Sequence, residues 1–349
     1  MKIITVIGAR PQFVKASILS REINKKKAFQ EIIIHTGQHF DPNMSEVFFN
    51  EMKIPAPKYS LGISSLAYPK MVDKMISKLL PIMKKENPDA VIVYGDTNST
   101  LAGSLSASQL KIPIFHVESG QRSYNRIMLE EVNRLITDHI SGILFCSSEN
   151  SVENLRKENI SSKIVHSGDI MLDAFLSNKK NIFSKNKNFS KYVLCTIHRR
   201  ENTNSKKRLT KIFKNLDKIN KTKKVILPLH PSTAKKIKEF NIRTNVSIIK
   251  QQGYMSFLSL LVNCDLVITD SGGVQKEAFF AKKNCITVRK ETEWPELVDL
   301  KVNILSKPKN LHKTYQKNSF NSLGFKRRIY GNGKSAQKII QSIVDYINE

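Results

Sequence analysis

The sequence feature that most constrains the fold is an alternation of short apolar, β-rich runs with helical patterns along nearly the whole chain. The β-rich runs lie at residues 2–8, 31–37, 89–95, 112–118, 142–148, 163–168, 192–198, 223–230, 264–270 and 284–289. Helical patterns such as 11–23, 99–110 and 128–140 separate most of them. This alternation is typical of parallel, doubly wound sheets, in which a crossover helix follows each strand. The sequence therefore predicts an α/β fold of the Rossmann-like type.

A lysine-rich stretch at 178–191 interrupts the alternation, which then restarts, and we interpret this stretch as a linker. A chain of 349 residues is also long for a single core and suits two domains. We expect an N-terminal Rossmann-like domain at 1–175 and a C-terminal one at 190–334. Isoleucines at helical spacing near the end predict a helix over 335–349 that packs back on the N-terminal domain.

The charge is strongly basic and unevenly distributed. The 57 Lys+Arg and 30 Asp+Glu give a net charge of +27, of which +4 falls in residues 1–170 and +23 in 171–349. Such an excess suits either a polyanion-binding surface or lysines on solvated helix faces and linkers. Aromatic residues do not interleave the lysines as base-stacking platforms would, so the second interpretation is favoured and no nucleic-acid partner is expected.

Other features of the composition bear on the cellular compartment. No uninterrupted apolar run reaches the roughly 18–20 residues of a membrane-spanning helix, so no integral membrane association is expected. The N-terminus begins with a β-type run and has no cleavable signal pattern. The four cysteines include no C-x-x-C pair, which argues against a disulfide framework or a zinc ribbon. These observations favour a cytoplasmic location.

Polar residues follow the predicted strands at the ends where open parallel sheets bind their ligands. In chain order they are Arg10, Gln38 with His39, Asp96, Glu118, His198, His230, Asp270 with Ser271, and Arg289. A single aspartate in such a place is more typical of a helix N-cap than of a catalyst, but capping alone does not explain the whole series. Two such rims facing each other would form an active-site cleft between the domains.

The turn at 270–278 has the character of a phosphate site. Gly272 and Gly273 let the backbone approach a ligand closely, and the helix that follows exposes N–H groups at its positive end. Glu277 stands about one turn further on, where it could accept two hydroxyls of a ribose. The alternative is an ordinary N-cap with a tight turn.

A second such turn lies at 8–15, where Arg10 and Lys15 flank a helix start and indicate an anionic ligand. The segment 331–335 resembles the tail of a Walker A loop. Arg328 stands where that loop needs its first glycine, so an ATPase is not expected.

Three carboxylates, Asp96, Glu118 and Glu130, are candidates for acid–base chemistry. Like charges around an anionic ligand raise carboxyl pKa values, which lets one group donate a proton while another accepts one. Glu131 lies about 100° around the helix from Glu130, so at most one of the two faces the site. The alternative for Glu131 is a surface pair with Arg134. The eight histidines form no H-x-x-x-H or H-E-x-x-H group, so no metal site is expected.

Taken together, the motifs resemble those of the non-hydrolysing UDP-N-acetylglucosamine 2-epimerases. The likeness is collinear from residue 3 to about residue 336 and rests on G-A-R-P-Q-F-V-K-A, H-T-G-Q-H, V-Y-G-D-T-N-S-T-L-A, H-V-E-S-G-Q-R-S, L-E-E-V-N-R-L-I-T-D-H, H-R-R-E-N, H-P-S-T, T-D-S-G-G-V-Q-K-E-A and Y-G-N-G-K-S-A. The resemblance implies a glycosyltransferase-B type architecture with the UDP-sugar in the interdomain cleft, usually in a homodimer. It also implies inversion at C2 of the sugar by loss of UDP, a 2-acetamidoglucal intermediate and re-addition of UDP. Neither a cofactor nor a metal is required, and the expected pathway is surface polysaccharide synthesis.

The resemblance also implies roles for individual residues. Asp96, Glu118 and Glu130 correspond to the acid–base set. His198, Arg10 and Lys15 correspond to groups around the departing diphosphate, where negative charge grows. The remaining predicted substrate-binding residues are Ser271, Gly272, Gly273 and Glu277 for phosphate and ribose, Gln252 and Phe257 beside the uracil, and Arg289 from the strand-end series.

This sequence departs from the family pattern in several places. The common G-T-R-P-E is here G-A-R-P-Q, the Pro before the Glu-Glu pair is Leu129, and the Arg of T-E-R-P-E is Trp294. The R-P-Q-F and T-E-W pattern resembles the branch that acts on UDP-2,3-diacetamido-2,3-dideoxy-glucuronate, for which Arg122 or Arg126 could supply a cation near C6. Allosteric activation in some members involves residues near Gln38 and His39, which are followed here by Phe40 and Asp41 instead of a basic and polar pair.

The leading hypothesis is an epimerase that interconverts UDP-N-acetylglucosamine and UDP-N-acetylmannosamine, with the diacetamido uronate as the alternative sugar. A hydrolysing 2-epimerase is disfavoured because that group carries G-T-R-A-D where this chain has G-A-R-P-Q. A glycosyltransferase of the same fold would explain a UDP site but explains the three carboxylates less well. A nucleic-acid-binding protein is the non-enzymatic alternative, and it predicts steeply salt-dependent polyanion binding.

Overall fold

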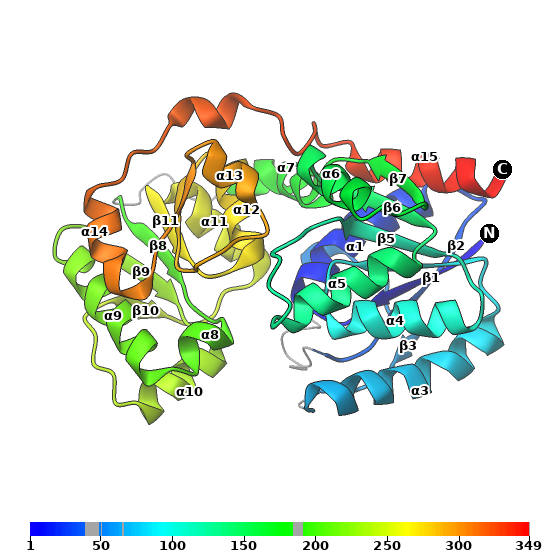
Figure 1. Ribbon diagram of the computed structural model, residues 1–349, viewed down its shortest axis with the longest axis horizontal. Coiled ribbons are helices and arrows are strands. Elements are labelled where there is room, and N and C mark those ends of the chain that lie inside the picture. The colour runs from blue at the N-terminus through cyan, green and yellow to red at the C-terminus, as the bar shows by residue number, and fades with distance from the viewer. Residues whose placement is uncertain (39–48, 50, 65, 184–190, 349) are drawn as a thin grey trace. The chain divides into compact units, whose positions relative to one another are not determined.

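The computed structural model describes all residues except 39–48, 50, 65, 184–190 and 349 (Figure 1). The chain divides into two compact units. Unit 1 comprises Met1–Ser177 and Arg328–Glu349, and unit 2 comprises Asn178–Arg327. Each unit is built around one parallel β-sheet, so the predicted α/β fold with two Rossmann-like sheets is confirmed.

The sheet of unit 1 has seven strands in the order β3-β2-β1-β4-β5-β6-β7, and every pair is parallel. The strands are β1 (Lys2–Ile7), β2 (Gln30–His35), β3 (Tyr59–Ser60), β4 (Ala90–Tyr94), β5 (Ile114–Ser119), β6 (Ile143–Cys146) and β7 (Lys163–His166). The helices are α1 (Arg10–Asn24), α3 (Tyr68–Glu86), α4 (Asn98–Gln109), α5 (Leu129–Ile140), α6 (Glu149–Lys157), α7 (Ile170–Phe183) and α15 (Ser335–Asn348). Helix α4 packs between α3 and α5, and the C-terminal helix α15 packs on α1 (Figure 1).

The sheet of unit 2 has six strands in the order β10-β9-β8-β11-β12-β13, again all parallel. The strands are β8 (Val193–Thr196), β9 (Val225–Pro228), β10 (Ser247–Ile249), β11 (Leu266–Thr269), β12 (Asn284–Thr287) and β13 (Asn303–Leu305). The α-helices are α8 (Arg200–Thr203), α9 (Lys206–Asn220), α10 (Pro231–Glu239), α11 (Tyr254–Asn263), α12 (Gly272–Phe280), α13 (Pro295–Asp299) and α14 (Leu311–Gln316). Two short 3₁₀ segments lie at Pro308–Asn310 and Ser322–Lys326.

The central strands are buried on both faces, which is why they read as continuous apolar runs in the sequence. The predicted linker at 178–191 is wrong in its first part, because α7 continues through it to Phe183. Lysine is a good helix former, so a lysine-rich composition does not end a helix. The edge strands β3, β10 and β13, of two or three residues each, were not among the predicted strands.

Each sheet has a topological switch point, where successive crossovers leave a strand in opposite directions along the sheet. In unit 1 it lies between β1 and β4, and in unit 2 between β8 and β11. Ligands of open parallel sheets bind beyond the carboxyl ends of the strands beside this point. Arg10 and Asp96 follow the two strands of the first switch point, and His198 and Asp270 follow those of the second.

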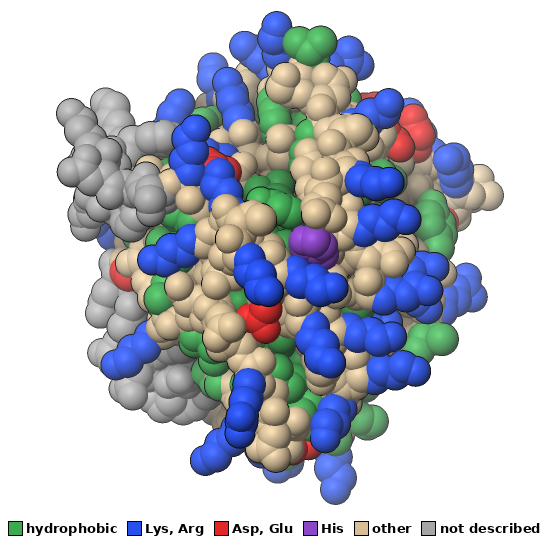
Figure 2. Space-filling model, turned by 90° about the vertical axis from the view of Figure 1, so that its left-hand side faces the viewer, with side chains coloured by type: hydrophobic (Ala, Val, Ile, Leu, Met, Phe, Trp, Pro, Cys, Tyr) green, Lys and Arg blue, Asp and Glu red, His purple; other side chains and the backbone are tan. Residues whose placement is uncertain are grey.

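The basic charge lies mainly in unit 2, which contains 33 Lys+Arg and 10 Asp+Glu. Figure 2 shows Lys and Arg side chains spread over one face with few acidic groups between them. In α9, lysines 206, 207, 211, 214 and 218 are exposed, while Leu209, Ile212, Phe213, Leu216 and Ile219 are buried. The helix therefore turns its apolar stripe to the core and its lysines to solvent.

Candidate active site

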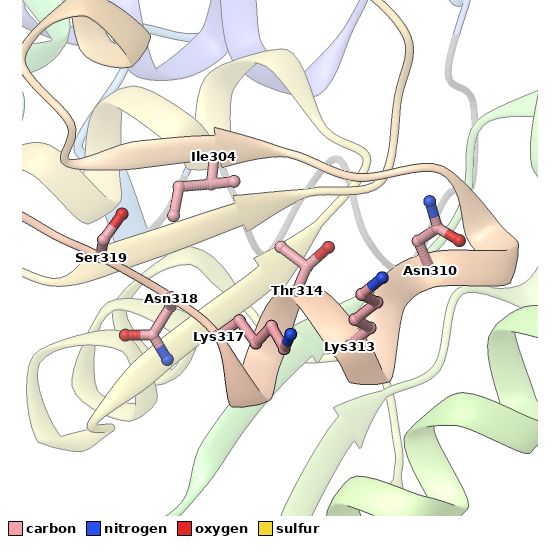
Figure 3. Close-up of a pocket in the computed structure, with 7 residues that line it drawn as sticks. All are labelled: Ile304, Asn310, Lys313, Thr314, Lys317, Asn318 and Ser319. Atoms are coloured by element: carbon pink, nitrogen blue, oxygen red, sulfur yellow. The ribbon is translucent and has the colours of Figure 1, made fainter.

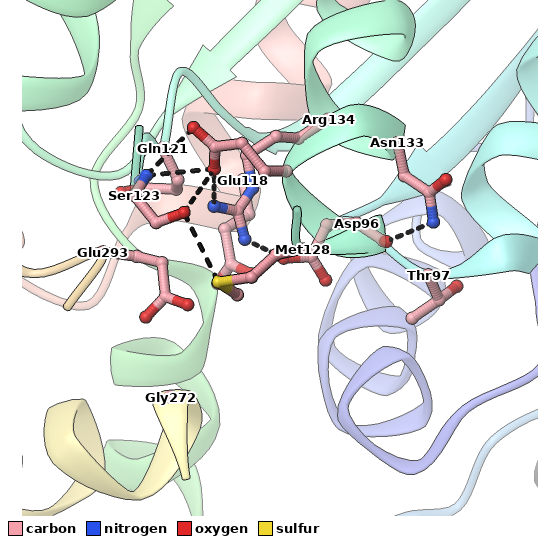
Figure 4. A network of polar contacts seen from close by, with 12 residues as sticks. Asp96, Thr97, Glu118, Gln121, Ser123, Met128, Asn133, Arg134, Gly272 and Glu293 are labelled. Atoms are coloured by element: carbon pink, nitrogen blue, oxygen red, sulfur yellow. Dashed lines mark hydrogen bonds and ion pairs between the residues drawn. The ribbon is translucent and has the colours of Figure 1, made fainter. Parts of the chain in front are cut away.

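Asp96 stands just beyond β4 and is held by two residues of α5. Its carboxylate forms an ion pair with Arg134, and its backbone carbonyl accepts a hydrogen bond of 2.9 Å from the Asn133 side chain (Figure 4). The Asp96 side chain is nevertheless 33% exposed. It is therefore fixed in position while remaining open to a ligand.

The two neighbouring glutamates of α5 point in different directions, as the helix geometry requires. Glu130 is exposed, whereas Glu131 is 1% exposed. The Glu131 carboxylate accepts hydrogen bonds from the backbone N–H groups of residues 123 and 124, from Ser123 Oγ and, at 2.6 Å, from Arg134. The alternative of a surface pair is thus wrong, because the loop before α5 buries the Glu131–Arg134 pair. Arg134 connects Glu131 to Asp96, a role that the spacing to Glu131 alone did not reveal.

Glu118 lies at an irregularity near the end of β5. The register between β5 and β6 shifts between Val117 and Ser119, and Glu118 has a φ of +69°, which is unusual for a residue with a side chain. Its carboxylate accepts a hydrogen bond of 2.5 Å from Lys15 Nζ, and Lys15 is 4% exposed. Lys15 therefore reaches from α1 to the second candidate carboxylate.

Gln12 is a structural residue that sequence reasoning recorded only as a departure from the family motif. It is 1% exposed, and its Oε1 accepts from the N–H groups of Gly8 and Ala9 at 2.8 and 3.0 Å. Its Nε2 donates to the carbonyl of Tyr94 at 3.0 Å. An amide can accept and donate in this way whereas a carboxylate cannot donate, so Gln12 joins the turn after β1 to the end of β4.

The two arginines considered for a uronate carboxylate differ. Arg122 is 2% exposed, and it donates to both carboxylate oxygens of Glu158 at 2.6 and 2.7 Å and to Asp138 Oδ2 at 2.7 Å. Burial alone would lower the pKa of Arg122, but the hydrogen bonds and charges of Glu158 and Asp138 raise it above its usual value. Arg122 is thus committed to a buried ionic network, and of the two only Arg126 is exposed. Arg10, the first residue of α1, is half-buried.

In unit 2, Asp270 organises the segment that carries His198. The Asp270 carboxylate is fully buried and accepts hydrogen bonds from the backbone N–H groups of His198 and Arg199 and from the Asn202 side chain. The His198 ring lies 3.8 Å (Nδ1 to Oδ1) from this carboxylate and is 39% exposed. Its centroid lies 5.8 Å from that of His230. Asp270 thus positions an imidazole that a ligand can reach.

The turn at the start of α12 leaves room for a ligand. Ser271 is the N-cap but its side chain makes no capping hydrogen bond, and a Cβ added to Gly273 would meet nothing within 4 Å. A Cβ on Gly272 would meet Arg199, Glu293 and Trp294 at 3.8 Å each. Glu277 is buried at 6% exposure. The free space at a helix N-terminus is compatible with a bound anion.

Charged and aromatic side chains, among them Arg199, Glu293 and Trp294, lie beside this turn. Arg289 is 2% exposed and donates to both oxygens of Glu293, at 2.7 and 2.9 Å, while Arg199 donates to the same carboxylate at 3.1 Å. Trp294 donates from Nε1 to the Gly272 carbonyl at 3.0 Å, and the ammonium of the buried Lys276 lies 4.0 Å from the indole centroid. Sequence reasoning gave Glu293 and Lys276 no role.

The remaining predicted residues are Gln252 and Phe257 of unit 2 and Gln38 with His39 of unit 1. Gln252 donates to the Lys250 carbonyl at 2.6 Å, and Phe257 is half-buried on α11. Gln38 accepts from Ser99 N and Oγ at the start of α4, at 3.0 and 2.8 Å. His39, like Phe40 and Asp41, lies outside the described residues.

A surface pocket of about 340 Å³ lies in unit 2 on the side of α14 (Figure 3). It is lined by Ile304, Asn310, Lys313, Thr314, Lys317, Asn318 and Ser319. None of the predicted site residues lines it. Over the described part of the chain, no group of three or more His, Cys, Asp or Glu side chains could hold a metal ion. The described helices likewise include none with the length and apolarity to cross a bilayer.

Two parallel Rossmann-like sheets, one in each unit, are the architecture of the glycosyltransferase-B type fold. A sucrose-phosphate synthase from Thermosynechococcus elongatus shares the fold at 10% identity, with a TM-score of 0.62 over 100% of this chain and 99% of that one.

The comparisons then identify the family within that class. The family model for UDP-N-acetylglucosamine 2-epimerase matches residues 21–344, so the chain belongs to this family of UDP-sugar 2-epimerases. A UDP-2,3-diacetamido-2,3-dideoxy-D-glucuronate 2-epimerase from Pseudomonas aeruginosa is 43% identical over 98% of this chain and 99% of its own length. A UDP-N-acetylglucosamine 2-epimerase from Methanocaldococcus jannaschii is 40% identical over 98% of both chains. The crystal structure of a Methanocaldococcus jannaschii UDP-GlcNAc 2-epimerase in complex with UDP-GlcNAc and UDP has a TM-score of 0.92, covering 99% of this chain and all of that one.

Proposed function

We propose that this isomerase is non-hydrolysing and interconverts UDP-N-acetylglucosamine and UDP-N-acetylmannosamine. The observation that carries the proposal is the pair of supported carboxylates in unit 1. Asp96 is paired with Arg134 and Glu118 with Lys15; Asp96 follows β4, and Glu118 lies near the end of the adjacent parallel strand β5. Two carboxylates on neighbouring strand ends suit proton removal and proton return at one carbon.

In the proposed reaction a carboxylate removes the C2 proton while the bond from C1 to the UDP oxygen breaks, leaving 2-acetamidoglucal and UDP. UDP then adds back to C1 as a proton returns to the other face of C2. Asp96, Glu118 and the exposed Glu130 supply the acid and the base. Arg10 and His198, with the N-terminus of α12 at Ser271, Gly272 and Gly273, bind the diphosphate, whose charge grows as it departs.

Glu277, Gln252 and Phe257 complete the proposed nucleotide contacts. Arg289 acts in this proposal through Glu293, which it holds beside Gly272. We further propose that the protein acts as a cytoplasmic homodimer in a surface polysaccharide pathway. Light scattering on the purified protein tests the dimer.

The reaction is tested by incubating the protein with UDP-N-acetylglucosamine in deuterated water. Deuterium at C2 of both epimers supports the proposal, and the absence of exchange in an active, folded preparation contradicts it. Release of free N-acetylmannosamine with stoichiometric UDP would instead indicate a hydrolysing enzyme. Sugar transfer to an acceptor would indicate a glycosyltransferase.

The acid–base assignment is tested by E118Q and D96N. Each substitution keeps the size of the side chain but removes its ability to exchange a proton, so turnover should fall about 10²- to 10⁴-fold. Both variants should stay folded and bind UDP, but with a lower melting temperature, because the buried Arg134 and Lys15 each lose a carboxylate partner. Near-normal turnover in either variant would refute the assigned role.

A second candidate substrate is UDP-2,3-diacetamido-2,3-dideoxy-glucuronate, favoured by Trp294 and by the 43% identity to the Pseudomonas aeruginosa enzyme of that name. A uronate carboxylate calls for an additional cation, and the commitment of Arg122 to Glu158 and Asp138 leaves Arg126 for that contact. Side-by-side kcat/KM values for the two sugars decide between them. R126Q should lower kcat/KM selectively for the uronate if that sugar is the substrate.

A further inference from the structure

A fully buried ionic network lies directly behind the two strand ends that carry Asp96 and Glu118. His116 of β5 and Asp138 of α5 are both 0% exposed, and His116 Nδ1 lies 2.7 Å from Asp138 Oδ1. The other ring nitrogen, Nε2, lies 2.7 Å from the carbonyl oxygen of Gly95. The imidazole therefore bridges from α5 to the peptide that immediately precedes Asp96.

The chemistry of the two partners determines the state of the ring. A backbone carbonyl can only accept a hydrogen bond, so Nε2 carries a proton. Burial tends to raise the pKa of Asp138, but the charges and hydrogen bonds of His116 and Arg122 hold it below its usual value. Its Oδ2 accepts from Arg122 Nη1 at 2.7 Å, while its Oδ1 faces His116 Nδ1.

The same network reaches the Glu118 side of the site. Asp138 Oδ2 accepts from the backbone N–H of Gly120 at 3.1 Å, two residues beyond Glu118. Gly95 in turn donates its N–H to the Val117 carbonyl at 2.9 Å, one residue before Glu118. The Gly95 peptide is consequently fixed to β5 through both its N–H and its C=O, in a conformation with φ of +62°.

We propose that His116 is a positioning residue: held between the Gly95 carbonyl and Asp138, its ring fixes the ends of β4 and β5 so that Asp96 and Glu118 keep their mutual placement. The inference rests on the proposed function through the roles of those two carboxylates. His116 touches no substrate in this scheme, and its effect passes through the Gly95 peptide.

Two substitutions separate the two hydrogen bonds of the ring. The side-chain amide of H116N corresponds to Nδ1 and retains a donor toward Asp138, whereas the longer amide of H116Q reaches the position of Nε2 and can donate to Gly95. H139N, a substitution of the exposed His139 of α5, provides the matched control. Epimerisation kinetics and thermal unfolding are measured for all three variants and the unsubstituted protein.

H116N should lower kcat about 10- to 100-fold with KM changed less than about two-fold, because the reacting groups are misplaced while the nucleotide contacts are kept. H116Q should recover most of that loss, and H139N should match the unsubstituted protein. A merely structural role predicts loss of thermal stability without a split between kcat and KM and without rescue by glutamine. Equal kcat in H116N and H116Q, or unchanged kcat in a folded H116N, would overturn the proposal.

A measurement independent of activity keeps this inference separable from the proposed function. In protein labelled with [¹⁵N]histidine, the ring signal that disappears in H116Q should show a protonated Nε2, as donation to the Gly95 carbonyl requires. A crystal structure of H116Q or H116N should show Gly95 in place in the former and displaced relative to Glu118 in the latter. An Nε2 without a proton, or an unmoved Gly95 in H116N, refutes the positioning role even if the protein proves inactive on both sugars.

Discussion

Gly95 offers a direct test of how closely the candidate site is packed, through comparison with Gly62. Both glycines have φ near +62°, at +62° and +63°. A Cβ added to Gly62 meets nothing within 4 Å, whereas one added to Gly95 lies 3.3 Å from Lys15 Nζ and 3.4 Å from Glu118 Oε1. The two alanine variants therefore share the same backbone strain and differ in what the new methyl group contacts.

The left-handed conformation costs an alanine about 1–2 kcal/mol, which both variants should lose in the free energy of unfolding. At about 2–4 °C per kcal/mol for units of this size, each melting temperature should fall by several degrees. In G95A the methyl group also crowds the 2.5 Å ion pair between Lys15 and Glu118, and Lys15 is too buried to swing into solvent. The methyl group forces a shift of a few tenths of an ångström in this pair, which should lower turnover several-fold, less than the roughly 10²-fold cost of a 1 Å misplacement.

The assay is kcat for epimerisation beside thermal unfolding in the same buffer. G62A should keep nearly full turnover despite its lower melting temperature, while G95A should lose both. Equal turnover in the two variants would show that the Lys15–Glu118 pair tolerates displacement. The reasoning that places Glu118 at the reacting carbon would then fail.

Further outcomes follow from the described contacts. G273A should leave the free energy of unfolding unchanged, since the new methyl group meets no atom of the protein within 4 Å. It should weaken UDP binding about 10-fold by calorimetry, because the methyl group would occupy the space proposed for the diphosphate. An unchanged Kd would argue against that placement. E131Q should cost about 3 kcal/mol in urea unfolding, because the buried Arg134 loses one of its two carboxylates; a loss below about 1 kcal/mol would contradict this. Burial lowers the pKa of His35 to about 4, below its unfolded value of 6.5. As the pH falls from about 6.5 to 4, the unfolded chain therefore binds a proton that the folded chain does not, and the free energy of unfolding declines. H35L should remove up to about 3 kcal/mol of that decline, measured as the free energy of unfolding at pH 7 and at pH 4.5. An equal decline in H35L and the unsubstituted protein would refute the prediction.

The sequence predicted the central strands well because a parallel strand buried on both faces is a continuous apolar run. Strands β3, β10 and β13 escaped prediction because they lie at sheet edges and span only two or three residues. Such segments take their extended form from a neighbouring strand rather than from a pattern of their own. The start of the predicted linker was also wrong, since helix α7 continues to Phe183 through lysine-rich residues whose composition alone suggests solvent exposure.

The candidate site could be predicted only in part. Strand-end position identified Asp96 and Glu118, but their partners Arg134 and Lys15 lie 38 and 103 residues away along the chain. Spacing carries no information about pairs at such separations, because the fold brings them together. The same holds for Arg122, which donates hydrogen bonds to Glu158 and Asp138, 36 and 16 residues away along the chain.

The return of the chain to unit 1 at Arg328 has a consequence for biosynthesis. Unit 2 is a continuous insertion, whereas the last helix of unit 1, α15, lies at the end of the chain and buries Ile339, Ile340 and Ile343. During translation unit 2 is made before α15, so the surface of α1 that α15 covers stays open until the whole insertion has been synthesised. Unit 1 is therefore begun before unit 2 but completed after it, and removal of α15 should harm unit 1 while sparing unit 2.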